Sequence, residues 1–148
     1  MADVYVAGAI VHVEKEHWKV YEKIGELCEE LGLSAHIPHI HTAEGRDPMV
    51  KDGGLGEPDP VHVFHTNYNA VKNARVLVVE VSNPSIGTGI EIGFALEWKK
   101  PIICLAHSSA KVTRMVRGPA KEGKFELIRY ETEEEAMQKL RQSLSRIL

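Results

Sequence analysis

Cysteine, excess positive charge and long apolar runs are all scarce in this sequence, and each scarcity excludes a class of protein. The 148 residues include two cysteines, Cys28 and Cys104, and both fall in apolar segments, which is typical of buried thiols rather than of a disulfide framework. The formal net charge of −3 gives nucleic-acid binding no electrostatic support. No apolar run approaches the roughly 18 residues that cross a membrane, and we see no signal-peptide pattern. We therefore expect a cytoplasmic protein that binds neither nucleic acid nor a membrane.

The composition that is present is that of one globular domain. Hydrophobic residues make up 43% of the chain and charged residues 26%, which is ordinary for such a domain. A chain of 148 residues buries about two thirds of its unfolded surface. There is no internal repeat and no low-complexity tract, so we expect a single domain over residues 1–148.

Apolar and amphipathic segments alternate along the chain. Apolar, β-branched runs predict strands over residues 3–10, 33–37, 76–81, 101–105 and 125–130. Amphipathic periodicity predicts helices over residues 14–31, 60–73 and 90–99 and from residue 132 onward. Strands that alternate with helices form a parallel sheet covered on both faces. We expect an α/β fold, a flavodoxin/Rossmann-like three-layer sandwich with a five-stranded parallel sheet in the order 2-1-3-4-5.

Capping residues predict where several helices begin and end. Gly32 is a C-cap for the first helix, and Asp59-Pro60 supplies an N-cap and an N1 proline for the second. Thr132 and Glu135 have the spacing of a capping box at the start of the last helix. Two long polar stretches are expected as loops, residues 38–60, which are rich in glycine and proline, and residues 106–124.

The most informative stretch joins the third and fourth predicted strands. It is a loop of hydroxyls and glycines, Ser82-Asn83-Pro84-Ser85-Ile86-Gly87-Thr88-Gly89, and it suits a small anionic ligand at the start of the next helix. In the order 2-1-3-4-5, ligands bind beyond the carboxyl ends of the first and third strands. Those ends are Gly8-Ala9-Ile10 and residues 82–89, so the topology places the ligand crevice beside Glu91.

Glu91 is the strongest candidate for a catalytic residue. We place it in the first turn of the helix, where the macrodipole favours the ionised carboxylate. A carboxylate beside a bound sugar can act as a nucleophile. The alternative is that Glu91 only improves the helix start, as many first-turn glutamates do.

Two other patterns are weaker. Histidines gather at His36, His39 and His41, but their spacing is irregular and both cysteines lie in apolar elements, so we expect no metal site. The glycines from Gly87 to Gly93 resemble a dinucleotide fingerprint. Their last spacing is wrong, however, and they follow the third strand rather than the first. We therefore expect no nucleotide cofactor there.

Two segments carry a family pattern, Val4-Tyr5-Val6-Ala7-Gly8-Ala9-Ile10 and residues 80–93, which contain the run Pro-Ser-x-Gly-x-Gly-x-Glu-x-Gly. They resemble the nucleoside 2-deoxyribosyltransferase superfamily, and its 2'-deoxynucleoside 5'-phosphate N-hydrolase branch in particular. Residues 102–105 and 115–120 also look similar to that branch. The resemblance extends from Val4 to about Tyr130 and is weakest between residues 11 and 60.

The resemblance implies hydrolysis of the N-glycosidic bond of a (deoxy)nucleoside 5'-monophosphate, by a retaining mechanism and without a cofactor. Glu91 matches the family nucleophile, and Tyr5 matches a tyrosine that positions the sugar and the nucleophile. Asn67 falls at the position of the residue that acts on the leaving base. The implied substrate-binding residues are Gly8, Ala9, Ile10, Ser85, Gly87, Thr88, Gly89, Thr113 and Met115. Thr113 falls near a residue that reaches the neighbouring subunit's site, so a homodimer with shared active sites is implied.

This chain departs from the family pattern at two places. The family has an aspartate that helps to protonate the leaving base, and Asn67 stands there; an amide holds a base but donates no titratable proton. The family's phosphate-contacting Arg-Gly-Gly stretch is replaced by Val11-His12-Val13-Glu14. Three hypotheses therefore stay open, which are a hydrolase of nucleoside monophosphates, a transferase that moves deoxyribose between bases through the same glutamate, and a nucleotide-binding module without turnover.

Overall fold

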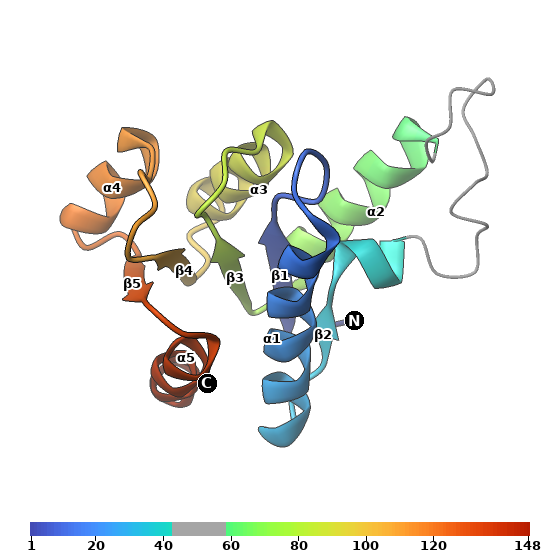
Figure 1. The fold of residues 1–148 in the computed structure, drawn as a ribbon. Coiled ribbons are helices and arrows are strands. Elements are labelled where there is room, and N and C mark those ends of the chain that lie inside the picture. The colour runs from blue at the N-terminus through green and yellow to red at the C-terminus, as the bar shows by residue number, and fades with distance from the viewer. Residues whose placement is uncertain (43–58) are drawn as a thin grey trace.

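A parallel β-sheet runs through the middle of the molecule, and the computed structural model describes residues 1–42 and 59–148 around it (Figure 1). Its strands are β1 (Val4–Gly8), β2 (Ala35–His36), β3 (Val76–Glu80), β4 (Ile102–His107) and β5 (Glu126–Tyr130). All neighbouring strands pair in parallel, in the order β2-β1-β3-β4-β5. Both the α/β class and the strand order predicted from the sequence are confirmed.

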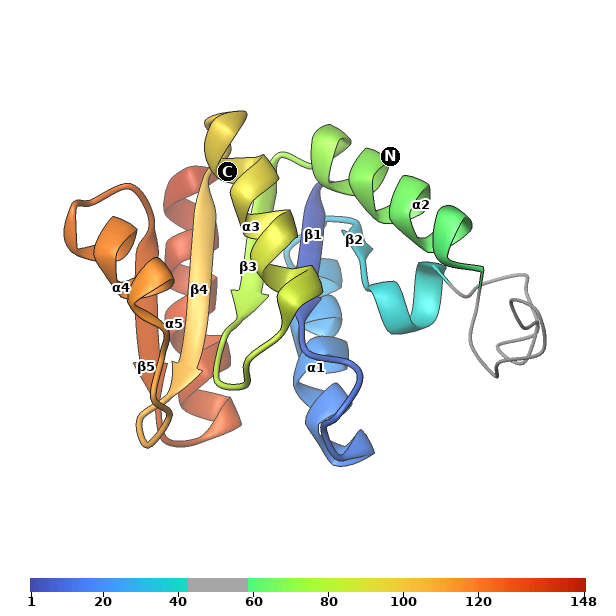
Figure 2. The same ribbon diagram turned by 90° about the horizontal axis from the view of Figure 1, so that it is seen from above.

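Helices cover both faces of this sheet. On one face lie α1 (Trp18–Glu30) and α5 (Glu133–Ile147), and on the other lie α2 (Pro60–Asn73), α3 (Ile86–Glu97) and α4 (Arg114–Lys121) (Figures 1 and 2). Because successive side chains of a strand point to opposite faces, Val4 and Val6 of β1 enter the core beneath α1 and α5. Tyr5 and Ala7 enter the core on the side of α2 and α3. The sheet thus aims Tyr5 toward α3.

Several helix ends are where the sequence predicts them. Gly32 adopts a positive φ of 74°, and the Gly32 and Leu33 N–H groups close α1 onto the Glu29 and Cys28 carbonyls, which is a Schellman motif. The Asp59 carboxylate accepts the Val61 N–H at 3.1 Å and caps α2. At α5, Thr132 accepts the Glu135 N–H, and the Glu135 carboxylate accepts the Glu131 N–H, one residue earlier than in a standard capping box.

Other boundaries differ from the prediction. Residues 114–121 form helix α4 inside the predicted loop over residues 106–124. Gly118 and Pro119 hide this helix in the sequence because they have the lowest helix propensities. Helix α3 begins at Ile86, four residues earlier than predicted. The predicted loop over residues 38–60 starts with a helical turn at Pro38–Thr42, and its residues 43–58 lie outside the described chain.

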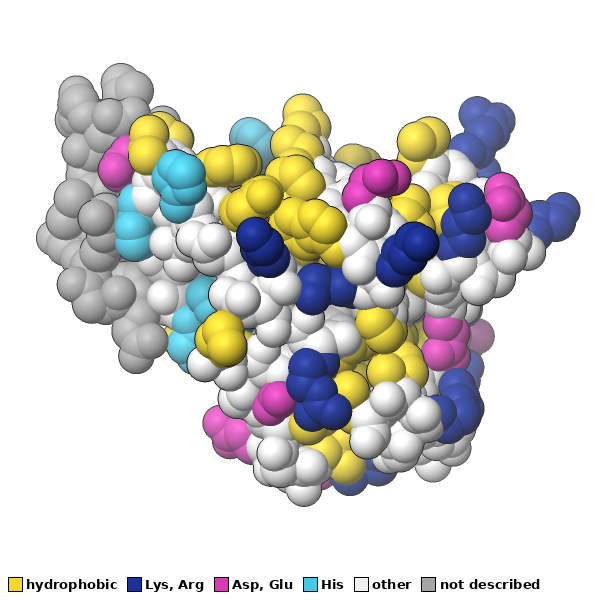
Figure 3. Space-filling view, turned by 180° about the vertical axis from the view of Figure 1, so that it is seen from behind, with side chains coloured by type: hydrophobic (Ala, Val, Ile, Leu, Met, Phe, Trp, Pro, Cys, Tyr) yellow, Lys and Arg dark blue, Asp and Glu magenta, His cyan; other side chains and the backbone are white. Residues whose placement is uncertain are grey.

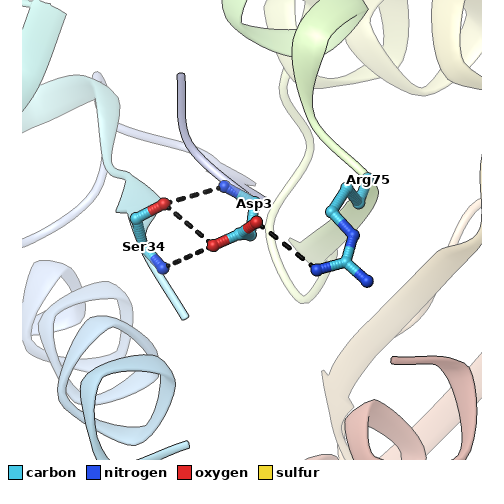
Figure 4. A network of polar contacts seen from close by, with 3 residues as sticks. All are labelled: Asp3, Ser34 and Arg75. Atoms are coloured by element: carbon cyan, nitrogen blue, oxygen red, sulfur yellow. Dashed lines mark hydrogen bonds and ion pairs between the residues drawn. The ribbon is translucent and has the colours of Figure 1, made fainter. Parts of the chain in front are cut away.

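The amino-terminal ends of three neighbouring strands are joined by hydrogen bonds (Figure 4). The Asp3 carboxylate accepts the Ser34 N–H at 2.9 Å and the Ser34 hydroxyl at 3.0 Å, and it also faces Arg75. These hydrogen bonds, chiefly the one from the Ser34 backbone, lower the pKa of Asp3. Asp3, Ser34 and Arg75 stand just before β1, β2 and β3, so this network aligns the three strands.

Cys28 and Cys104 are both buried free thiols, as predicted. Burial raises the pKa of Cys28 to about 11 and that of Cys104 to about 12, so neither is a reactive thiolate near neutral pH. None of the helices over residues 1–42 and 59–148 has both the length and the apolar character of a membrane span.

Candidate active site

A pocket of about 540 Å³ is lined by residues that follow β1 and β2 and by residues of α2 and α3. The loops after β1 and β3 leave the sheet on the same side (Figure 2). Four of the predicted site residues line the pocket, namely Ile10, Asn67, Gly87 and Glu91. Its walls are largely apolar and include the aromatic side chains of Trp18, Phe64, Tyr68 and Phe94. Such walls suit the flat face of a nucleobase.

Glu91 and Tyr5 meet at the wall of this pocket. The Tyr5 side chain is fully buried in β1, and its hydroxyl donates a hydrogen bond to Glu91 Oε2. Burial, and then the neighbouring Glu91 charge, raise the pKa of Tyr5 well above its usual range. Tyr5 therefore stays protonated and acts as a donor that holds the carboxylate in place.

The position of Glu91 within α3 corrects the sequence interpretation. Ser85 is the N-cap and Ile86 the first residue of α3, so Glu91 lies in the second turn, beyond the reach of the strongest dipole effect. Burial raises the pKa of Glu91 to about 7, and the Tyr5 hydrogen bond opposes this rise. The prediction of a carboxylate held ionised by the helix start is therefore wrong. Both protonation states of Glu91 are populated near neutral pH.

The first turn of α3 lies beside open space. Ser85 Oγ accepts the Thr88 N–H at 3.2 Å, and the Ser85 carbonyl accepts the Gly89 N–H at 3.1 Å. Among the described residues, no acceptor stands opposite the Ile86 and Gly87 N–H groups. A Cβ added at Gly87 or Gly89 would meet no atom within 4 Å. Exposed N–H groups at a helix N-terminus form a suitable site for an anion such as a phosphate.

The loop that leads into α3 is held by a buried carboxylate. Glu80 is 1% exposed and accepts three hydrogen bonds, from the Ser82 N–H at 2.6 Å, the Ser82 hydroxyl at 3.0 Å and the Tyr130 hydroxyl at 2.5 Å. The Ser82 hydroxyl oxygen accepts the His107 N–H at 2.8 Å. Glu80 thereby ties the carboxyl ends of β3, β4 and β5 together and fixes where α3 starts.

Asn67 lies across the pocket in α2 and belongs to a group of polar side chains. The Thr42 hydroxyl donates to Asn67 Oδ1 at 2.6 Å, and His36 Nε2 lies 2.9 Å from the same hydroxyl. The His62 Nε2–H donates to the Thr42 carbonyl at 3.1 Å. The His36 ring also stacks on Tyr5, with centroids 5.5 Å apart. Sequence reasoning missed the role of Thr42, His36 and His62, because a lone threonine and irregularly spaced histidines give no pattern.

Four other predicted site residues do not line this pocket, namely Gly8, Ala9, Thr113 and Met115. Gly8 serves packing, since a Cβ there would lie 2.4 Å from the Tyr21 hydroxyl, which donates to the buried Ala9 carbonyl at 2.6 Å. Thr113 caps α4 by accepting the Met115 N–H, and Met115 is 81% exposed. Helix α3 stands between α4 and α2 (Figure 1), so within one chain Thr113 and Met115 are not brought to Glu91.

Within residues 1–42 and 59–148, no three His, Cys, Asp or Glu side chains lie close enough together to bind one metal ion. Each of the three clustered histidines makes another contact. His36 stacks on Tyr5, His39 packs at 5.0 Å from Trp18, and His41 Nδ1 accepts the Ile37 N–H at 2.8 Å. Burial, and then the charge of His41, lower the pKa of His36 to about 4, so His36 is neutral near pH 7.

Comparison with known proteins identifies the family of this chain. Residues 4–140 match the family model described as nucleoside 2-deoxyribosyltransferase. The chain is 40% identical over 121 residues to a putative 2'-deoxynucleoside 5'-phosphate N-hydrolase 1 of Thermofilum pendens, covering 80% of this chain and 79% of that protein. It is 38% identical over 133 residues to the human 5-hydroxymethyl-dUMP N-hydrolase, covering 86% and 71%. Its structure is similar to that of a Clostridium botulinum CMP N-glycosidase, with a TM-score of 0.64 and 25% identity over 93% of this chain and 96% of that one.

Proposed function

This chain belongs to the nucleoside 2-deoxyribosyltransferase family and is an N-glycosidase, and we propose that it hydrolyses the N-glycosidic bond of (deoxy)nucleoside 5'-monophosphates. The products are the free base and a (deoxy)ribose 5-phosphate. The observation that carries this proposal is the pair of Tyr5 and Glu91 at the wall of an apolar pocket, beside the exposed N-terminus of α3. Relatives named as nucleotide N-hydrolases support the same substrate class.

Glu91 acts as the nucleophile in this proposal. Its ionised carboxylate attacks the anomeric carbon while the base leaves with the electron pair of the C–N bond. Water then hydrolyses the resulting glycosyl ester, so the sugar keeps its anomeric configuration. Tyr5 donates to Oε2 and keeps the carboxylate aimed at the sugar. A pocket wall that raises the pKa of Glu91 to about 7 also leaves its ionised form weakly solvated and hence reactive.

The first turn of α3 binds the 5'-phosphate. The Ile86 and Gly87 N–H groups and the Ser85 hydroxyl offer donors, and the open space above Gly87 and Gly89 leaves room for the group. Charge-assisted hydrogen bonds contribute about 1.5–3 kcal/mol each, so two or three of them favour a monophosphate strongly over its nucleoside. This arrangement partly replaces the arginine that the family places after the first strand.

A second copy of the chain completes the site. Thr113 and Met115 of one chain reach the phosphate bound by its partner, and the assembly is a homodimer with shared active sites. Exposed apolar side chains on α2 and α3 support such pairing, since Val61, Phe64, Ile86 and Ile90 are each half or more exposed. Hydrophobic side chains also gather along the upper part of the face that Figure 3 shows. Apolar surface of this kind is typical of contact with another protein surface.

The test is a panel of nucleosides and their 5'-monophosphates, assayed for free base by chromatography with no acceptor base present. We expect base release from monophosphates by the native protein and none by Glu91→Gln, because an amide is a poor nucleophile and carries no charge. Each tenfold loss of rate corresponds to about 1.36 kcal/mol of barrier. Glu97→Gln is the matched control, since Glu97 is an exposed residue at the end of the same helix. Substantial turnover by Glu91→Gln would exclude Glu91 as the nucleophile.

The family description favours one alternative, a transferase that passes deoxyribose from one base to another through the same Glu91 ester. A transferase needs an acceptor base and has no need of a phosphate site. Equal rates on nucleoside and monophosphate, with turnover only after a second base is added, would decide for the transferase. Ligand binding without base release under any condition would instead point to a nucleotide-binding module.

A further inference from the structure

We propose that the amide of Asn67 donates a hydrogen bond to the leaving base and that Thr42 is the positioning residue that fixes this amide. The inference rests on the proposed N-glycosidase function and names the substrate feature that the site selects. That feature is a hydrogen-bond acceptor on the base which gains negative charge as the C–N bond breaks.

The Thr42 hydroxyl sets the direction of the hydrogen bonds. A hydroxyl has one proton to donate, and Thr42 donates it to Asn67 Oδ1 at 2.6 Å. The contact of 2.9 Å between Thr42 Oγ1 and His36 Nε2 must then be a donation from the ring to the hydroxyl oxygen. A neutral imidazole carries one N–H, and burial keeps His36 neutral by lowering its pKa to about 4. The chain of donors therefore runs from His36 through Thr42 to Asn67.

This direction orients the Asn67 amide. Its oxygen faces Thr42, so its NH₂ group lies at the opposite edge of the planar amide, and Asn67 lines the pocket. Thr42 itself is 6% exposed, and its carbonyl accepts a hydrogen bond from His62 of the same helix α2. The amide is thus held on one side by two elements that pack together, and it offers donors rather than an acceptor to a ligand.

The same contacts relate Asn67 to the nucleophile. His36 stacks on Tyr5 with an interplanar angle of 9°, and Tyr5 holds Glu91. Asn67 and Glu91 therefore lie at two ends of one continuous set of contacts, Asn67–Thr42–His36–Tyr5–Glu91. This fixes the distance between the group that attacks the sugar and the group that receives the base, which is what a displacement at the anomeric carbon requires.

The chemistry that follows is departure of the base as an anion. When Glu91 forms its bond to the anomeric carbon, the electron pair of the C–N bond stays on the base nitrogen and delocalises onto acceptor atoms such as a ring nitrogen or a carbonyl oxygen. An amide donor stabilises that charge but transfers no proton. The site should therefore prefer monophosphates whose free base is a stronger acid, and the base takes its proton from water after release.

The experiment uses 2'-deoxyuridine 5'-monophosphates with different substituents at C5, which share their acceptors and differ in the acidity of the released base. For the native protein we expect kcat to rise steeply with that acidity. Thr42→Val should lower kcat by about 10- to 100-fold with little change in KM, because an Asn67 amide that Thr42 no longer fixes loses its hydrogen bond to the base, which strengthens as charge develops there. Thr42→Ser should restore the rate. Asn67→Asp should raise the rate on the poorest leaving groups and flatten the dependence, because a protonated aspartic acid can donate a proton.

Thr66→Val is the matched control, because Thr66 lies beside Asn67 on α2 and its hydroxyl is 3.5 Å from His62 Nε2 rather than bonded to the Asn67 amide. The inference would be overturned by a native kcat that does not depend on the acidity of the leaving base. A folded Thr42→Val variant with the native kcat and the native dependence on that acidity would also overturn it. In both cases, base release from monophosphates would still support the proposed function. No base release from any monophosphate would overturn both. If Thr42→Val does not fold, as judged by circular dichroism, Asn67→Asp and the native dependence decide the matter.

Discussion

At the scale of single residues, the chemistry concentrates in Glu91, a partly buried glutamate that has no positively charged partner among the described residues. Burial raises the pKa of Glu91 to about 7, and Tyr5 supplies the hydrogen bond that limits this rise. The ionised carboxylate therefore lowers the stability of the folded chain and is at the same time a reactive group, a combination typical of functional sites. Two consequences can be measured, one in the rate and one in the stability.

The first prediction concerns the pH dependence of the rate. Because the nucleophile must be ionised, kcat/KM for base release should rise with pH with a midpoint near pH 7, following Glu91, and level off above it. Tyr5→Phe removes the hydrogen bond that favours the charged form, so it should move the midpoint to higher pH and lower the plateau. The pH profile of kcat/KM checks both effects, with Tyr21→Phe as the control, since the Tyr21 hydroxyl donates to the Ala9 carbonyl instead. A Tyr5→Phe midpoint at or below the native one would contradict this assignment.

The second prediction concerns stability. The pKa of Glu91 rises from 4.5 to about 7 on folding, so the folded chain binds a proton more tightly than the unfolded chain does. Proton binding therefore favours the folded state, fully below pH 4.5, and this contribution to stability is lost as the pH rises through 7. Glu91→Gln carries no ionisable group at this position, so its stability does not fall in this pH range. The variant should be more stable than the native chain at pH 8, by up to about 3 kcal/mol, and equally stable near pH 4. Denaturant unfolding at both pH values measures this, and Glu97→Gln should show no such difference. The same offset at both pH values would mean that burial of the charge is not the cause.

At the scale of elements, α3 both holds the nucleophile and forms the anion site, and its start is where the sequence was hardest to interpret. Glycines at 87 and 89 lower helix propensity, so residues 82–89 read as a loop, yet Ser85 caps a helix that already begins at Ile86. The same reason hid α4, with its Gly118 and Pro119. In both helices the glycines lower helix propensity, and what they provide instead is free space beside the backbone, since a Cβ at Gly87, Gly89 or Gly118 would meet no atom within 4 Å.

The third prediction tests the first turn of α3. Ser85→Ala removes a hydroxyl donor, so the ratio of kcat/KM for a monophosphate to that for its nucleoside should fall by about tenfold or more, the effect of one charge-assisted hydrogen bond. The substitution also removes the N-cap interaction with Thr88, which costs about 1 kcal/mol of stability. Thr132→Ala is therefore the control, since it removes an equivalent cap from α5, far from the pocket. An unchanged ratio in Ser85→Ala would place the phosphate elsewhere.

At the scale of the whole molecule, the alternation of strands and helices was sufficient to predict the sheet and its order, and the pocket lies at the carboxyl ends of the strands, where the sequence predicts a ligand. The family resemblance inferred from residues 80–93 is confirmed by the match over residues 4–140. The group that surrounds Asn67 could not be predicted, because Thr42 and Asn67 are 25 positions apart and meet only when α2 packs beside the segment after β2. The raised pKa of Glu91 could not be predicted from the sequence either, because it depends on burial by several elements together.

The last prediction concerns the assembly of two chains. If Thr113 of one chain serves the site that contains Glu91 of its partner, then Thr113→Arg and Glu91→Gln each abolish base release when expressed alone. Co-expressed with tags that allow separation, they form dimers half of which are mixed, and each mixed dimer keeps one site with native Glu91 and native Thr113. Random pairing therefore restores about a quarter of native activity, and the purified mixed dimer about half. Full activity of Thr113→Arg alone, or a mixed dimer as inactive as its parents, would mean that each chain builds its site from its own residues, and that the exposed Met115 side chain faces something other than a second active site.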